Sequence, residues 1–163
     1  MHYYRYYLSP LGQMLIVAND AGVSGLYFVD QKYYRDVRAD WREDAAQEHV
    51  ARCARELDEY YAGARTEFGF AMAPEGTAFQ RAVWKAISSV PYGETISYAQ
   101  LARRAGGGAN PRAAGTATGR NPISIAVPCH RIVGSNGSLT GYAGGLDKKR
   151  ALLALESREP SLL

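Results

Sequence analysis

The segment Pro128-Cys129-His130-Arg131 holds the residues of this sequence best suited to covalent chemistry. A cysteine reacts as its thiolate, and the positive environment that His130 and Arg131 create favours that charged form. Pro128 restricts the backbone before the thiol, and a Gly-rich loop, 134–145, follows within a few residues. This setting is typical of a positioned nucleophile whose substrate enters under a loop.

The same cysteine follows an apolar run, Ile123 to Val127, so a second interpretation is a buried thiol that only packs. The residues alone leave both interpretations open. The other cysteine, Cys53, has no clear chemical partner, and we expect both thiols to stay reduced. With three histidines in the chain, a structural zinc site is not expected, and we predict no bound metal.

Composition limits the class of protein. The 163 residues are 47% hydrophobic and 21% charged, as in a folded chain with one ordinary domain or two small lobes. No apolar run is long enough to span a bilayer, and residues 1–12 lack the apolar core of a signal peptide. We therefore expect a cytoplasmic protein that does not contact membranes.

Charge is distributed unevenly along the chain. The formal net charge is only +3, but residues 96–131 contain no Asp or Glu. Five arginines lie in that stretch: Arg103, Arg104, Arg112, Arg120 and Arg131. A polyanion would therefore bind the second half of the chain in preference to the first.

The first half has the pattern of a small sheet with a helix. Segments 3–8, 14–17 and 23–29 are rich in Tyr, Val, Leu and Ile and are separated by turn sequences, which predicts an antiparallel meander. A helix is expected over 45–62, ended by Gly63, and a short strand over 67–72. The break at 74–76 predicts a boundary between lobe 1–74 and lobe 75–163.

The second half is predominantly helical. Thr77 with Gln80 predicts a capped helix, and Ser97 with Gln100 predicts a second one. Asn110 before Pro111 has the sequence of a third helix start, which predicts a helix-turn-helix over 97–119 with a Gly-rich turn, 106–109. Such helix pairs also occur as plain core elements, and the pattern alone leaves that interpretation open. An extended segment at 121–127 and a final helix over 146–156 complete the prediction.

The second half of the chain carries a series of contiguous motifs, of which the strongest is Pro128-Cys129-His130-Arg131-Ile132-Val133. The others are Thr77 to Gln80 with Val83-Trp84, Pro91 to Thr95, Ser97-Tyr98, Arg112 to Gly115, Asn121-Pro122 and Gly141 to Gly145. Together, and in register, they resemble the motifs of the O6-alkylguanine-DNA alkyltransferases, in their free-standing bacterial form. The match is dense over 77–156 and loose before it. It implies an α/β (α+β) fold, with a ribonuclease H-like lobe preceding a mostly helical lobe.

This resemblance implies direct reversal of DNA damage. Cys129 would take an alkyl group from O6 of guanine, and also from O4 of thymine, in a single irreversible turnover that needs no cofactor. Glu156 would orient His130, which would accept the thiol proton through a water molecule. Asn121 would hold the backbone that supports the cysteine turn.

The resemblance also implies how the base is bound. Tyr98 is expected at guanine N3, and the Tyr142 hydroxyl and the Ala143 N–H near O6, where they would meet the developing negative charge. Carbonyl groups around Cys129 and Ile132 would accept from the exocyclic amine.

Double-stranded DNA carrying the lesion is the implied partner of a monomeric protein, and the target nucleotide would be flipped out. The third helix has small residues, such as Ala113, and few side chains that could read base edges, which favours the minor groove. Tight helix packing would explain the same small residues. Arg112 would fill the gap left by the flipped nucleotide, and Arg120 and Lys149 would contact phosphates.

Two other functions remain to be distinguished. A non-catalytic protein that only recognises alkylated DNA is the main alternative, although its known examples carry Trp in place of the cysteine. A Cys–His hydrolase is the other, but adjacent residues seldom orient well for a direct dyad. Turnover separates the hydrolase, which would cycle, from a transferase that stops at one equivalent.

Overall fold

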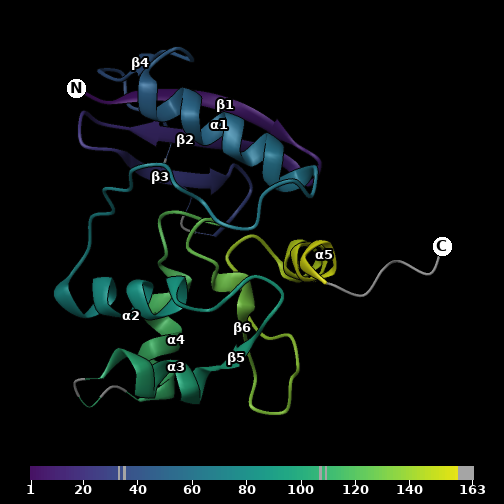
Figure 1. Ribbon diagram of the computed structural model, residues 1–163. Coiled ribbons are helices and arrows are strands. Elements are labelled where there is room, and N and C mark those ends of the chain that lie inside the picture. The colour runs from purple at the N-terminus through teal and green to yellow at the C-terminus, as the bar shows by residue number, and fades with distance from the viewer. Residues whose placement is uncertain (33, 35, 107, 109, 158–163) are drawn as a thin grey trace. The chain divides into compact units, whose positions relative to one another are not determined.

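The computed structural model describes residues 1–32, 34, 36–106, 108 and 110–157. The chain forms two compact units (Figure 1). The first comprises residues 1–77 together with 122–126, and the second comprises 78–121 and the chain from 127 onward. Residues 122–126 thus pack with the first unit, although they lie within the range predicted for the C-terminal lobe. Among the described residues, no helix combines the length and apolarity needed to cross a bilayer.

The first unit contains the predicted antiparallel meander. β1 (Tyr3–Ser9) pairs with β2 (Gly12–Ala18), which pairs with β3 (Val23–Phe28). A two-residue strand that was not predicted, β4 (Arg42–Glu43), adds parallel to β1, so the sheet order is β3-β2-β1-β4. β2 and β3 are buried almost throughout, and the helix that follows the sheet packs against them.

The helix α1 (Glu48–Tyr61) covers one face of this sheet (Figure 1). It begins at Gln47, whose side chain accepts hydrogen bonds from the first free N–H groups, and it ends before Gly63. Gly63 has φ +76°, a left-handed conformation that glycine adopts without the cost of a Cβ clash. The apolar stripe of α1, which includes Val50, Leu57 and Tyr60, is fully buried.

A buried carboxylate joins α1 to the segment that follows it. Glu56 is fully buried and accepts from the Gly69 backbone N–H (2.7 Å) and from Arg52 Nε (2.7 Å). Arg65 Nη1 lies 3.6 Å from Oε1, the oxygen that accepts from Gly69. Burial raises the pKa of Glu56, but these hydrogen bonds and the two cations outweigh burial and lower it.

The strand expected over 67–72 is not regular. The structure shows a single bridge there, between Val23 and Met72, and the flanking hydrogen bonds connect Val23 to Ala71 and Ala73. The prediction failed because the segment is anchored by Glu56 at Gly69 and not by a full ladder.

The second unit contains four α-helices among its described residues, and their predicted starts are close to the observed ones. The capping box of Ser97 with Gln100 is present, and Asn110 caps the next helix through a 2.8 Å bond to the Ala113 N–H. Gly107 and Ala109 of the predicted turn lie outside the described residues. The helices are α2 (Ala78–Ser88), α3 (Tyr98–Ala105), α4 (Pro111–Gly119) and α5 (Leu146–Glu156).

Helices α2, α3 and α4 pack against one another (Figure 1). The indole N–H of Trp84 on α2 donates to the Ala117 carbonyl of α4 (2.9 Å). The same carbonyl accepts from the Arg120 N–H at the end of α4 (3.2 Å), and the indole bond fixes α4 against α2. The helix-turn-helix pair is therefore held by a third helix.

Residues 121–127, which were predicted to be extended, form a turn instead. Within the first unit, Ile123 bridges to Leu26, and the Leu26 N–H donates to the Pro122 carbonyl (2.8 Å). Ile125 has φ +71°, which is unusual for a β-branched residue and costs free energy. A local signal could not predict it, because β-branched residues favour extended backbone.

Glu56→Gln should lower the free energy of unfolding by about 1–3 kcal/mol, because it removes the charge from a buried, fully bonded acceptor. Glu59→Gln is the matched control, since its partner Arg65 is only part-buried and exposed ion pairs contribute little.

The pKa of Glu56 is lowered on folding, so its contribution is present above the ordinary value of 4.5 and is lost as pH falls through the folded pKa. Urea unfolding at pH 7 and at acidic pH measures both effects. Equal stability of the two variants at pH 7 would contradict the assignment.

Candidate active site

The cysteine turn forms the centre of the candidate site. Cys129 begins a short 3-10 helix, Cys129–Arg131, and is 6% exposed. Asn121 Nδ2 donates to the Val127 carbonyl (2.8 Å) and to Cys129 Sγ (3.2 Å). Asn121 therefore supports the backbone ahead of the cysteine, as predicted from the resemblance, and it also contacts the sulfur itself.

His130 and Glu156 form a buried pair. His130 Nε2 lies 2.7 Å from Glu156 Oε2, and both side chains are almost completely buried. The other ring nitrogen, Nδ1, is buried and has no hydrogen-bond partner among the described residues. With the proton on Nε2 and shared with the carboxylate, Nδ1 keeps its lone pair and can accept a proton.

Burial shifts the pKa values of His130 and Cys129 in opposite directions. Burial lowers the pKa of His130, although the Glu156 hydrogen bond and charge act to raise it. Burial also raises the pKa of Cys129, against the Asn121 hydrogen bond and the charge of Lys149. Both directions favour a neutral imidazole and a neutral thiol at neutral pH, so that forming the thiolate calls for a local proton acceptor.

Lys149 is not a phosphate contact, contrary to the sequence-based prediction. Its side chain is completely buried, and Nζ donates to the carbonyls of Ile132 (2.5 Å), Thr140 (2.8 Å) and Gly141 (3.2 Å). Burial lowers its pKa to about 8, while the nearby Cys129 acts to raise it. A helical pattern did not reveal this role, because the partner carbonyls belong to a strand and a loop that precede α5.

Tyr98 lies at the start of α3, close to the same loop. Its hydroxyl donates to the Thr140 carbonyl (3.2 Å), and Lys149 Nζ lies 6.0 Å from its ring centroid. Burial raises its pKa, so it remains a neutral phenol that can donate a hydrogen bond. Tyr142 and Ala143, the other expected base contacts, are half-buried in the loop that Tyr98 and Lys149 hold.

Ile132 follows the cysteine turn in β6 (Ile132–Val133), which pairs with β5 (Ile96–Ser97). Its carbonyl, one of those expected to read the exocyclic amine, already accepts from Lys149. A carbonyl has two lone pairs, so this bond leaves one for a further donor.

Arg112 and Ala113, two of the predicted DNA-binding residues, lie on α4. Ala114, Ala117 and Thr118 are buried in the helix packing, whereas Arg112, Thr116 and Gly119 follow at intervals of three or four residues on the outer face. The small residues of α4 therefore differ in setting. Ala114 and Ala117 are buried where α4 packs against α2 and α3, whereas Gly119 faces open space, because an added Cβ there would meet nothing within 4 Å.

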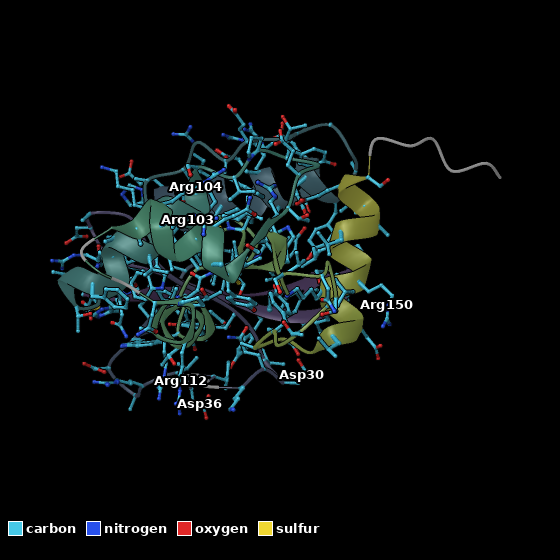
Figure 2. All side chains as sticks on the ribbon, turned by 90° about the horizontal axis from the view of Figure 1, so that it is seen from below. Asp30, Asp36, Arg103, Arg104, Arg112 and Arg150 are labelled. Carbon is cyan, nitrogen blue, oxygen red and sulfur yellow. The ribbon has the colours of Figure 1, made fainter. Side chains whose placement is uncertain are left out.

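Arg112 is exposed at the first turn of α4 (Figure 2). Ala113 beside it is half-buried, and Arg120 is exposed just after the helix. We found no ion pair of Arg112 with any residue that the structure describes.

One residue of the site was missed as a participant. Arg131 was noted from the sequence only as a nearby positive charge, but it is buried and binds Glu156 with two nitrogens, at 2.7 and 3.0 Å. Its position directly after His130 was the available signal.

In the described part of the chain, no group of three or more His, Cys, Asp or Glu side chains is placed to hold a metal ion.

These features define a class: a two-unit α/β protein with a helix-turn-helix and a buried Cys-His-Glu cluster in its second unit. Residues 2–74 match the ribonuclease-like domain of 6-O-methylguanine DNA methyltransferase, and residues 78–158 match the DNA binding domain of the same family. The chain belongs to the 6-O-methylguanine DNA methyltransferase family, as its motifs indicated.

Its relatives align over nearly their whole length. A methylated-DNA–protein-cysteine methyltransferase of Methanosarcina acetivorans is 44% identical over 94% of this chain and 97% of its own. One of Mycolicibacterium paratuberculosis is also 44% identical, over 95% and 92%. The OGT protein of Mycobacterium tuberculosis, crystallised in complex with DNA, is similar in structure, with a TM-score of 0.86 and 41% identity over 94% of this chain and 92% of that one.

Lys149→Met should raise the pKa of Cys129 further, because it removes the buried cation that favours the thiolate. A shift of about one unit would slow reaction with iodoacetamide about tenfold at pH 7.5. The rate against pH, followed by mass spectrometry, measures the shift. Lys148→Met is the matched control, since Lys148 Nζ donates to the Gly144 carbonyl (3.3 Å), whereas Lys149 is the lysine that acts on the pKa of Cys129. Identical profiles for the two variants would contradict this role of Lys149.

Proposed function

We propose that this protein repairs alkylated DNA directly, by moving an alkyl group from O6 of guanine onto Cys129. The observation that carries the proposal is the cysteine turn, in which Asn121 bonds the sulfur and His130, paired with Glu156, keeps a free lone pair on Nδ1. Membership of the methyltransferase family supports the reaction, and the DNA complex of the mycobacterial relative supports DNA as the partner.

The reaction is a displacement at the alkyl carbon. The thiol proton moves through a water molecule to His130 Nδ1, and the thiolate then forms the S–C bond as the C–O6 bond breaks. The electron pair of the broken C–O6 bond stays on the guanine. The guanine takes up one proton, equivalent to the one that the thiol lost, and leaves as the neutral base. Glu156 stabilises the imidazolium that forms between these steps, as a buried carboxylate beside a histidine does in other nucleophilic sites.

Donors around the base would stabilise the negative charge as it develops on the guanine. Tyr98 is a neutral donor whose hydroxyl would turn from the Thr140 carbonyl to guanine N3. The Tyr142 hydroxyl and the Ala143 N–H, on the loop that Lys149 anchors, would meet O6. The thymine O4 ether carries a similar alkyl–oxygen bond and is expected to react as well.

The product fixes the stoichiometry. A thioether on Cys129 has no good leaving group, and nothing in the proposed relay regenerates the thiol. Each molecule therefore accepts one alkyl group, without a cofactor. This irreversible single turnover separates the proposal from a hydrolase.

The outer face of α4 would approach the minor groove. Thr116 and Gly119 on this face are small, so the DNA backbone can come close without base-specific contacts, which suits a lesion in any sequence context. Arg112 would occupy the place of the flipped nucleotide, and Arg120 would contact a phosphate.

Incubation with a duplex that contains one O6-methylguanine should add a single methyl to the protein, located on Cys129 by peptide mapping. Cys129→Ala should abolish transfer and retain DNA binding, whereas Cys53→Ala, the control at the other buried thiol, should still transfer. A bound lesion with no added mass on the wild-type protein would indicate recognition without repair. Repeated turnover would indicate a hydrolase.

Arg112→Ala should slow repair of the duplex lesion about tenfold or more, because about 1.4 kcal/mol lost from the flipped state corresponds to that factor. Reaction with free O6-benzylguanine should change little, since a free base needs no flipping. Arg150→Ala is the charge-matched control: Arg150 is exposed on α5, whereas Arg112 extends from α4 (Figure 2). Single-turnover rates on both substrates measure the effect, and equal losses on both would refute the flipping role.

A further inference from the structure

Arg131 has every nitrogen of its guanidinium engaged. Nε and Nη2 donate to the two oxygens of Glu156, and Nη1 donates to the Val90 carbonyl (2.7 Å). The guanidinium also lies 5.7 Å from the ring centroid of Tyr92, whose hydroxyl donates to the Leu155 carbonyl (3.2 Å). The fork of Arg131 matches a carboxylate in geometry as well as in charge, so it sets the plane of Glu156.

The Glu156 carboxylate is therefore shared. Oε1 accepts from Arg131, and Oε2 accepts from both Arg131 and His130. With both oxygens directed by the fork, Oε2 presents one remaining lone pair to the imidazole. That geometry selects the tautomer with the proton on Nε2 and leaves Nδ1 as the acceptor.

The charges around His130 come from two elements. Glu156 and Lys149 lie on α5, and Cys129 and Arg131 lie in its own turn. A buried carboxylate alone would favour a protonated imidazole, which could not accept the thiol proton. Arg131 opposes that effect, because it places a cation on the same carboxylate, and Lys149 acts in the same direction.

We propose that Arg131 is a positioning residue for alkyl transfer: it orients Glu156 and offsets its charge, so that His130 rests neutral with its lone pair on Nδ1. This inference rests on the proposed function, because it assigns His130 as the proton acceptor. A purely structural Arg131 would hold α5 in place but would not set the protonation state of His130.

The test is the titration of His130, followed by ¹⁵N NMR on the full, unalkylated chain. The protein has three histidines, and the variants His2→Gln and His49→Gln assign the signals of the other two. In the wild type, we expect a neutral ring protonated on Nε2 from pH 6.5 to 8. In Arg131→Met, the titration midpoint should rise by about one pH unit or more.

The transfer rate to free O6-benzylguanine should follow the same change. For Arg131→Met, the acidic limb of the pH–rate profile should move to higher pH with the His130 midpoint. One pH unit then implies about a tenfold loss of rate at a pH below both midpoints, recovered at pH 9. Arg131→Lys keeps the charge but loses the fork, so its midpoint should remain near that of the wild type while its rate falls at every pH. Arg150→Met, on the exposed side of α5, should change neither.

Two results would overturn the inference. One is a His130 midpoint in Arg131→Met that equals the wild-type value, with an equal loss of rate at every pH. If that variant does not fold, the wild-type spectrum decides, because an imidazolium at pH 7 or a proton on Nδ1 contradicts the proposal. Both spectra are recorded without substrate, so a failure of methyl transfer would refute the proposed function and leave this test intact.

Discussion

Removing ionisable side chains from water is the constraint on which the second unit depends. Glu156, Arg131 and Lys149 are all buried, and each must find partners that replace its hydration. Arg131 and Glu156 satisfy each other, and Lys149 takes three carbonyls from the strand and the loop beyond the cysteine. The same bonds that make burial tolerable also fix α5, the cysteine turn and the loop as one assembly.

The sequence predicted features that depend on short-range physics. The meander, the Ser97 capping box and the Asn110 cap all follow from residues within a few positions of one another, and the structure contains each. The alkyltransferase motifs indicated the family for the same reason, because they are contiguous. The His130–Glu156 contact spans 26 residues, and it was anticipated only through the family resemblance.

What the sequence could not reveal depends on long-range pairing. Lys149 has the composition of a surface cation, and only the carbonyls of Ile132, Thr140 and Gly141 explain why it is buried. The turn at Ile125 contradicts the local preference of its residue type, since pairing with β3 supplies the free energy that holds it. The segment 67–72 failed as a strand for a similar reason: one buried carboxylate replaced a ladder of backbone bonds.

The bond between the Trp84 indole and the Ala117 carbonyl makes α4 optically visible. Indole emission responds to loss of a hydrogen bond and to changes in the polarity around the ring, and Trp84 is buried against the helix that carries Arg112. The only other tryptophan in the sequence, Trp41, stacks on His2 in the first unit. The Trp41→Phe variant would therefore have a single tryptophan, whose emission, excited selectively over that of the tyrosines, would report displacement of α4 in real time without an added dye.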